Sequence, residues 1–194
     1  METKKSREWE AMRSRFEHIT DTLGMPIDKG ILDAVIVLNL LGVTTRQSCE
    51  GHLDRGDCAP WISFTTLEAT PMYKQAAQEH DRVMCISKEK KYTYEELQGL
   101  FAPARELRSR ADALHAFGQR KVLSLLEVFY SERYISHDCM LVVYSRVPGS
   151  SILESQGAKL QIIREEDEKA VKLCVYQQEM QHFARFLKER FLYE

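Results

Sequence analysis

The sequence lacks any apolar run long enough to cross a membrane. A transmembrane helix needs about 20 consecutive apolar residues, and no segment of the 194 residues approaches that length. The N-terminal segment, METKKSREWEAMRSRFEH, is too polar for a secretory signal peptide. We therefore expect a soluble, cytoplasmic protein that does not engage a membrane.

Charge and cysteine content show no strong bias either. The 27 basic and 29 acidic residues give a formal net charge of -2, so there is no global attraction to nucleic acid or to anionic lipid. The five cysteines are odd in number and loosely spaced. This pattern argues against a disulfide framework and favours a reducing compartment.

Several familiar enzyme signatures are missing. The sequence has no G-x-x-x-x-G-K phosphate loop, no G-x-G-x-x-G, no H-E-x-x-H and no G-x-S-x-G. The deaminase pairing of H-x-E with P-C-x-x-C is absent too. The motifs therefore assign no reaction and leave the cofactor unknown.

Apolar periodicity accounts for most of the chain as helix. It predicts helices over residues 5–20, 28–42, 71–87, 93–102, 104–130 and 166–191. Asp28 is a suitable N-cap and Gly42 a suitable C-terminal residue for the second helix. Thr93 and Glu96 match a capping box, and Pro103 is expected to break or restart the helix that begins there.

Four short segments are typical of strands. They lie at residues 43–49, 61–66, 139–147 and 158–163, and a turn at 148–151 joins the last two. Together the elements predict an α+β fold, a helix-rich single domain spanning 1–194 around a small, mostly antiparallel sheet. Residues 71–130 are a candidate helical insertion between the two pairs of strands.

The densest chemistry lies in TRQSCEGHLDRGDC, residues 45–58. It follows a predicted strand, where a rigid scaffold can present polar side chains to solvent. We predict that this loop, residues 46–57, acts on a small anionic or nucleotide-like molecule. The catalytic candidates, suited to acid–base work, are His52, Glu50 and Asp54. The substrate-binding candidates, which offer anion pairing, close backbone approach or stacking, are Arg46, Ser48, Cys49, Gly51, Arg55 and Trp61.

The same stretch also has alternative interpretations. Cys49, His52 and Cys58 are three candidate ligands for structural zinc. The fourth ligand would be His80, Cys85 or His137. No second compact ligand pair is present, so the leading interpretation contains no metal. A Cys49 nucleophile with His52 as its base is a further alternative.

Residues 43–66 resemble known sequences locally. The order helix, Gly, strand, Ser-Cys-x-Gly-His, polar loop and Pro-aromatic strand resembles small bacterial and phage proteins of uncharacterised function. More loosely, Ser48, Cys49, Gly51 and the strand led by Trp61 are similar to a Ser-Ser-Cys-Ser-Gly-Arg segment of the tRNA wybutosine-synthesising methyltransferase family. That resemblance implies a methyl transfer from S-adenosylmethionine to a modified guanosine. Departures from the pattern occur at Gln47, Glu50 and His52.

The predicted helices at 104–130 and 166–191 favour a different class of function. Their broad apolar stripes would form a homodimer or partner surface in a non-enzymatic interaction protein, and the 46–57 loop would then be structural. Basic residues spread around the first of these helices, which indicates a solvated face more than a nucleic-acid patch. These residues are Arg105, Arg108, Arg110, Arg120 and Lys121. A small molecule is therefore the leading partner, ahead of nucleic acid.

Overall fold

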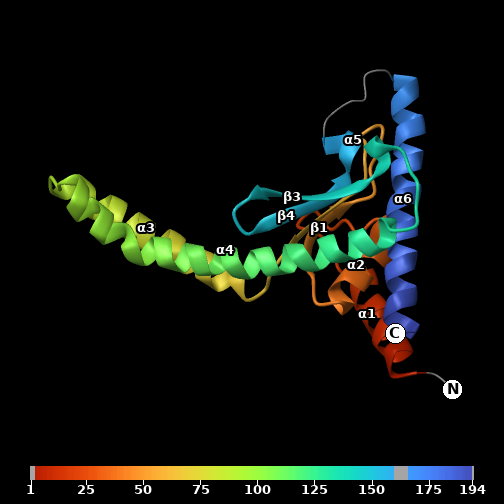
Figure 1. Ribbon diagram of the computed structural model, residues 1–194, viewed down its shortest axis with the longest axis horizontal. Helices are drawn as coiled ribbons and strands as arrows, with labels where there is room; N and C mark the ends of the chain where they lie inside the picture. Colours follow the sequence, from red (N-terminus) through yellow and green to blue (C-terminus); the bar gives the residue numbers. More distant parts are fainter. Residues whose placement is uncertain (1–2, 160–165, 194) are drawn as a thin grey trace.

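The computed structural model describes residues 3–159 and 166–193. The helices are α1 (Lys4–Glu17), α2 (Lys29–Leu40), α3 (Ala69–Glu89), α4 (Tyr94–Tyr130), α5 (Gln156–Lys159) and α6 (Glu166–Tyr193), with a short 3₁₀ helix, η1 (His137–Cys139). The strands are β1 (Thr44–Cys49), β2 (Trp61–Thr65), β3 (Leu141–Val147) and β4 (Ser150–Ser155). The expected helix-rich α+β fold around a small antiparallel sheet is confirmed (Figure 1).

The four strands form one sheet in the order β1-β2-β4-β3, with every neighbouring pair antiparallel. Leu153 pairs with Ile62 on one side and with Val143 on the other, and all three join the hydrophobic core. Trp61 pairs with Glu154 one position away. Because side chains alternate along a strand, Trp61 and Glu154 lie on the face opposite the core.

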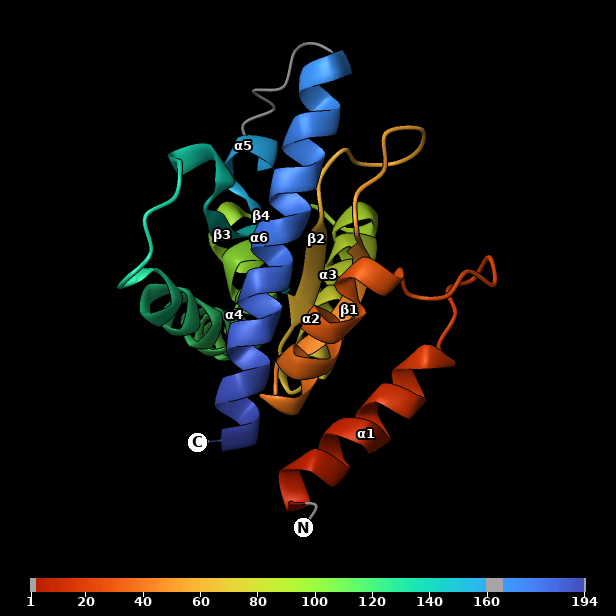
Figure 2. The same cartoon turned by 90° about the vertical axis from the view of Figure 1, so that its right-hand side faces the viewer.

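The core lies between the sheet, α2 and α6. Figure 2 shows α6 and α2 crossing the same side of the sheet, with α1 beyond them. Helix α2 is buried on nearly every side, as its composition predicts. Buried side chains of α6 are Tyr176, Met180, Phe183 and Leu187, and complete burial of one such side chain contributes about 1.5 to 3 kcal/mol.

Helices α3 and α4 form a long hairpin that projects away from the sheet (Figure 1). The capping box is confirmed: Thr93 Oγ1 accepts from the Glu96 N–H, and Glu96 accepts from the Thr93 N–H. The C-terminal half of α4 returns to the core through Val122, Leu126 and Phe129. Helix α4 therefore belongs both to the projecting hairpin and to the core.

The predicted break at Pro103 is wrong, because α4 runs through it. Proline lacks the N–H that would bond to the carbonyl one turn earlier. The Arg105 side chain donates to the Gln98 carbonyl, at 2.6 Å, and to the Gln98 side chain. Gln98 directly precedes Gly99, whose carbonyl loses its helical donor at Pro103. Pro103 is exposed, so its ring displaces no packed neighbour.

The fourth strand lies earlier in the chain than predicted. Gly149 adopts φ 76°, which reverses the chain tightly after β3. Strand β4 therefore begins at Ser150, within the segment predicted to be a turn. Residues 158 and 159 belong to α5, and residues 160–163 of the predicted strand lie outside the described residues.

The described parts of the chain contain no helix with both the length and the apolar character that a membrane crossing requires. The long helices instead alternate buried and exposed positions. The α6 stripe and the C-terminal part of the α4 stripe, which suggested a partner surface, pack in the core of the chain itself.

Two leucines on α4 test whether this helix returns to the core. Leu126 is 5% exposed and Leu123 is 46% exposed. We expect Leu126→Ala to lower the free energy of unfolding by about 2 to 5 kcal/mol, because it empties a packed volume. Leu123→Ala, the same change on the same helix, should cost about 0.5 kcal/mol. Urea unfolding followed by circular dichroism measures both, and equal effects would contradict this packing.

Candidate functional site

The loop after β1 is braced against the N-terminus of α2. Asp28 is the N-cap of α2, yet its side chain makes no bond to its own helix. Asp28 Oδ2 accepts instead from the Glu50 N–H at 3.1 Å and lies 3.3 Å from His52 Nε2. In return, Glu50 Oε2 accepts from the Gly30 N–H at 2.7 Å. Glu50 therefore caps α2 from outside the helix. The positive end of the helix dipole also stabilises its negative charge.

Helix α6 holds the same loop from its other side. Gln177 Nε2 donates to the carbonyls of Glu50 and Gly51, at 3.0 and 3.3 Å. Gly51 has φ 84°, and a Cβ there would lie 2.6 Å from Leu173 Cδ1 and 2.7 Å from the Ala59 carbonyl carbon. Both the backbone conformation and the close packing require glycine at this position.

Cys49 lies within this braced region. Its Sγ accepts from the Gly51 N–H at 3.3 Å. Burial raises the pKa of the Cys49 thiol, and the carboxylates of Asp28, Asp57 and Glu50 raise it further against the lowering effect of the Gly51 bond. The thiolate is the reactive form of cysteine, so these surroundings do not favour Cys49 as a free nucleophile.

Three different ligand groups meet in this region. One carboxylate oxygen of Asp28, Cys49 Sγ and one ring nitrogen of His52 lie within 4.8 Å of one another. Among the described residues, no other group of three or more ligand side chains is this compact. The predicted zinc set contained Cys58 in place of Asp28. The candidates for a fourth ligand lie elsewhere: His80 and Cys85 on α3, and His137 in η1.

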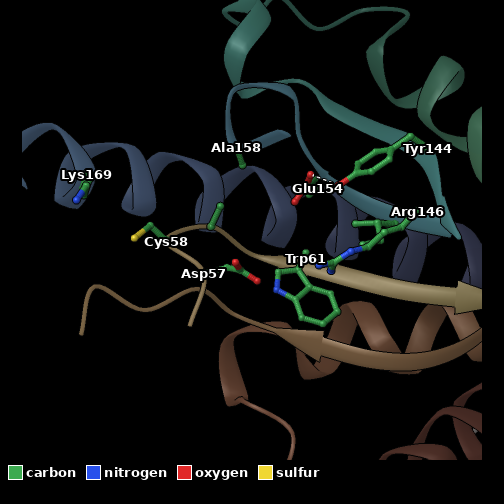
Figure 3. A pocket seen from close by; sticks show the side chains of 10 residues that line it. Asp57, Cys58, Trp61, Tyr144, Arg146, Glu154, Ala158 and Lys169 are labelled. Atoms are coloured by element: carbon green, nitrogen blue, oxygen red, sulfur yellow. Dashed lines mark hydrogen bonds between the residues drawn. The ribbon is translucent and has the colours of Figure 1, made fainter. Parts of the chain in front are cut away.

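A cavity of about 450 Å³, here called the sheet pocket, opens beside the end of this loop (Figure 3). Figure 3 shows Trp61, Arg146 and Glu154 facing one another, with Lys169 of α6 at the far end of the pocket. Its polar and aromatic lining consists of Asp57, Trp61, Tyr144, Arg146, Glu154 and Lys169. Cys58 also lines it. The volume falls within the range of about 300 to 1,000 Å³ that is usual for small-molecule sites.

The sheet register assembles this lining. Trp61 pairs with Glu154, and Tyr144 pairs with Ile152, two residues away on β4 and therefore on the same face. Tyr144 Oη donates to Glu154 Oε1 at 2.6 Å. Burial, followed by this hydrogen bond, raises the pKa of Tyr144 to about 12. At neutral pH the phenol therefore keeps its proton and orients the Glu154 carboxylate.

Trp61 contributes an apolar ring and a hydrogen-bond donor. The indole Nε1 is buried, and no described residue accepts a hydrogen bond from it. A buried donor without an acceptor costs about 1 to 3 kcal/mol.

A second cavity, of about 530 Å³, lies on the same sheet face and includes Arg46, Ser63, Thr65 and Ser150. Arg46 Nη2 donates to Thr70 Oγ1 at 3.2 Å. Arg46 occupies the irregular position between Thr45 and Gln47, where the pairing of β1 with β2 shifts. The structure thus separates Arg46 from the rest of the predicted loop site.

The predicted site residues fall into separate places. Trp61 lines the sheet pocket, whereas Asp54 and Arg55 are exposed at the loop tip. Ser48 pairs with Ile62 and so points toward the core face. The braced region contains Cys49, Glu50, Gly51 and His52.

Sequence reasoning missed four residues of the sheet pocket: Tyr144, Arg146, Glu154 and Lys169. Only the alternation in LVVYSRV could have indicated that Tyr144 and Arg146 share a face. Nothing local indicated that β4 or α6 would contribute. The basic residues of α4 are exposed, and Arg105 and Arg108 line a separate cavity between α3 and α4.

Comparisons with known proteins returned no match: no family model, no curated protein and no solved structure matches this chain. The function is therefore argued from the geometry of the site.

Two loop glycines provide a matched pair for testing the close packing at Gly51. Gly51 and Gly56 both have positive φ, but nothing lies within 4 Å of a Cβ at Gly56. We expect Gly56→Ala to cost about 1 kcal/mol from backbone strain alone. Gly51→Ala should cost about 1 to 3 kcal/mol more, because the added methyl group is overpacked. Equal free energies of unfolding for the two variants would contradict this geometry.

A second pair of variants tests whether Glu50 caps α2. We expect Glu50→Ala to lower the free energy of unfolding by about 1 kcal/mol, because the Gly30 N–H loses its acceptor. Glu50→Gln keeps an amide oxygen at the same place and should retain most of the stability. Thermal unfolding of the three proteins measures the difference. An alanine variant as stable as the wild type would show that the cap contributes nothing.

Proposed function

We propose that the protein binds a small anionic molecule of the nucleotide class in the sheet pocket. The observation that carries this proposal is the combination of an aromatic ring, two cationic and two anionic side chains around one cavity of about 450 Å³. The site borders the 46–57 loop through Asp57 and is centred on the sheet.

The aromatic part of the ligand would contact Trp61. Stacking of a base on an aromatic side chain contributes about 1 to 3 kcal/mol. Polar side chains surround this ring, so a heteroaromatic ring fits better than a plain hydrocarbon. Tyr144 adds a second aromatic wall.

The charged residues match the remaining parts of a nucleotide. Arg146 is suited to a phosphate group, because it can donate two parallel hydrogen bonds. Lys169 lies at the far end of the pocket from Arg146 (Figure 3). Asp57 and Glu154 are acceptors for exocyclic amines, ring N–H groups or sugar hydroxyls. Tyr144 holds Glu154 in place, which reduces the entropy lost on binding.

The proposal also includes a candidate reaction, which is methyl transfer. The resemblance of residues 43–66 implies methyl transfer, and S-adenosylmethionine also combines a heteroaromatic ring with charged groups. S-adenosylmethionine is therefore one of the ligands to titrate.

Isothermal titration calorimetry tests the proposal with adenosine, guanosine, cytidine and uridine monophosphates, their nucleosides and S-adenosylmethionine. We expect at least one monophosphate to bind more tightly than its nucleoside. Arg146→Gln should lower the ratio of monophosphate to nucleoside affinity about 10- to 100-fold, because a charge-assisted hydrogen bond contributes about 1.5 to 3 kcal/mol. Trp61→Leu should weaken the nucleotide and its nucleoside equally.

Arg55→Gln is the matched control, because Arg55 is exposed at the loop tip outside the sheet pocket. It should leave binding unchanged. If Arg55→Gln weakens the nucleotide and Arg146→Gln does not, the anion binds at the loop and the sheet pocket is the wrong site. Absence of binding by every probe would contradict the proposed ligand class.

A further inference from the structure

The N-terminus of α2 is capped by Glu50, which lies outside the helix. The carboxylate of the N-cap residue, Asp28, therefore makes no bond to α2. An N-cap aspartate ordinarily accepts from an N–H in the first turn of its own helix. Asp28 makes no such bond, because Glu50 supplies the acceptor for the Gly30 N–H. The Asp28 carboxylate is turned instead toward His52, 3.3 Å away.

We propose that Asp28, Cys49 and His52 form a three-ligand site for a divalent transition-metal ion of the zinc class. The three side chains offer one oxygen, one sulfur and one nitrogen atom within 4.8 Å of one another. This site is separate from the sheet pocket, and its test does not depend on the proposed nucleotide ligand.

The distances suit tetrahedral coordination. Oxygen and nitrogen ligands about 2.0 to 2.2 Å from zinc lie roughly 3.3 to 3.5 Å apart at a tetrahedral angle. Asp28 Oδ2 and His52 Nε2 are 3.3 Å apart. Cys49 Sγ lies within 4.8 Å of both atoms. A thiolate ligand bonds zinc at about 2.3 Å, which places it about 3.6 Å from the other two ligands, so Cys49 Sγ would move inward when the metal binds.

The charges also balance. When the metal binds, the Cys49 thiol proton leaves to solvent and a sulfur–metal bond forms with no change in oxidation state. The thiolate and the Asp28 carboxylate then neutralise a divalent ion, and His52 binds as the neutral imidazole. Glu50 and Asp57 add negative potential around Cys49, which favours a cation.

The ligands are held in place by backbone contacts. The Gly51 N–H donates to Cys49 Sγ at 3.3 Å, and the Glu50 N–H donates to Asp28. The His52 N–H donates to the Asp57 carbonyl at 2.9 Å. Contacts of this kind orient ligands and raise metal affinity.

The site keeps access to solvent. The side chains of His52 and Asp28 are 18% and 24% exposed. Three protein ligands leave a fourth position for water, which is the arrangement of catalytic zinc sites. Cys49 is also the cross-strand partner of Trp61, so the metal would lie next to the strand that carries the pocket's aromatic ring.

Cobalt titration of the metal-free full chain tests the site directly. We expect one equivalent of Co²⁺ to give a thiolate charge-transfer band and the intense visible bands of tetrahedral cobalt. Excess Zn²⁺ should abolish these bands and raise the melting temperature, because a ligand that binds only the folded state stabilises it. Absence of these bands in the wild-type protein would overturn the proposal.

The variants separate this ligand set from one that contains Cys58. Cys49→Ser should abolish the charge-transfer band, and Asp28→Asn should weaken Co²⁺ binding at least about tenfold. Asparagine also serves as an N-cap, so the helix is kept, and circular dichroism checks the fold. Cys58→Ser should bind as the wild type does. Loss of binding in Cys58→Ser, or wild-type binding in Cys49→Ser or Asp28→Asn, would overturn the assignment.

Discussion

The reciprocal bracing of Asp28 and Glu50 is the constraint on which this end of the molecule depends. Asp28 accepts from the Glu50 backbone, and Glu50 accepts from the first turn of α2. Two backbone N–H groups that would otherwise lack acceptors are thereby satisfied across 20 residues of chain or more. The bond network sets the direction in which the chain leaves β1, and Gly51 can then pass close to Ala59 and α6.

The sheet separates two environments because its side chains alternate between faces. One face joins α2, α4 and α6 in the core. The other carries Trp61, Glu154 and Tyr144, brought into neighbouring rows by the register of β2, β4 and β3. A register shift of one residue in any of these strands would turn its core side chains to the pocket face and its pocket side chains to the core. The same register that buries Ile62 and Leu153 therefore builds the pocket.

The loop with the densest chemistry serves the structure more than its composition suggested. Glu50 caps a helix, and Gly51 fills a position where only glycine fits. Its Cys49 and His52 lie beside the carboxylate of Asp28, more than 20 residues earlier in the chain. The sheet pocket draws its charged lining mainly from strands and from α6. Asp28, Cys49 and His52 thus meet at the end of β1, whereas the sheet pocket extends over β2, β4 and β3.

The sequence by itself determined the helices, three of the four strands and the placement of chemistry after β1, because periodicity, caps and turn residues act over a few positions. It also indicated Asp28 as a helix boundary, Gly51 as a conformational requirement and Trp61 as a pocket residue. Only the tertiary structure decided that α4 passes through Pro103, that β4 begins at Ser150, and that Asp28 faces His52. Only the tertiary structure places Tyr144, Arg146 and Glu154 beside Trp61. These outcomes depend on strand register and on contacts between distant segments, which no local pattern encodes.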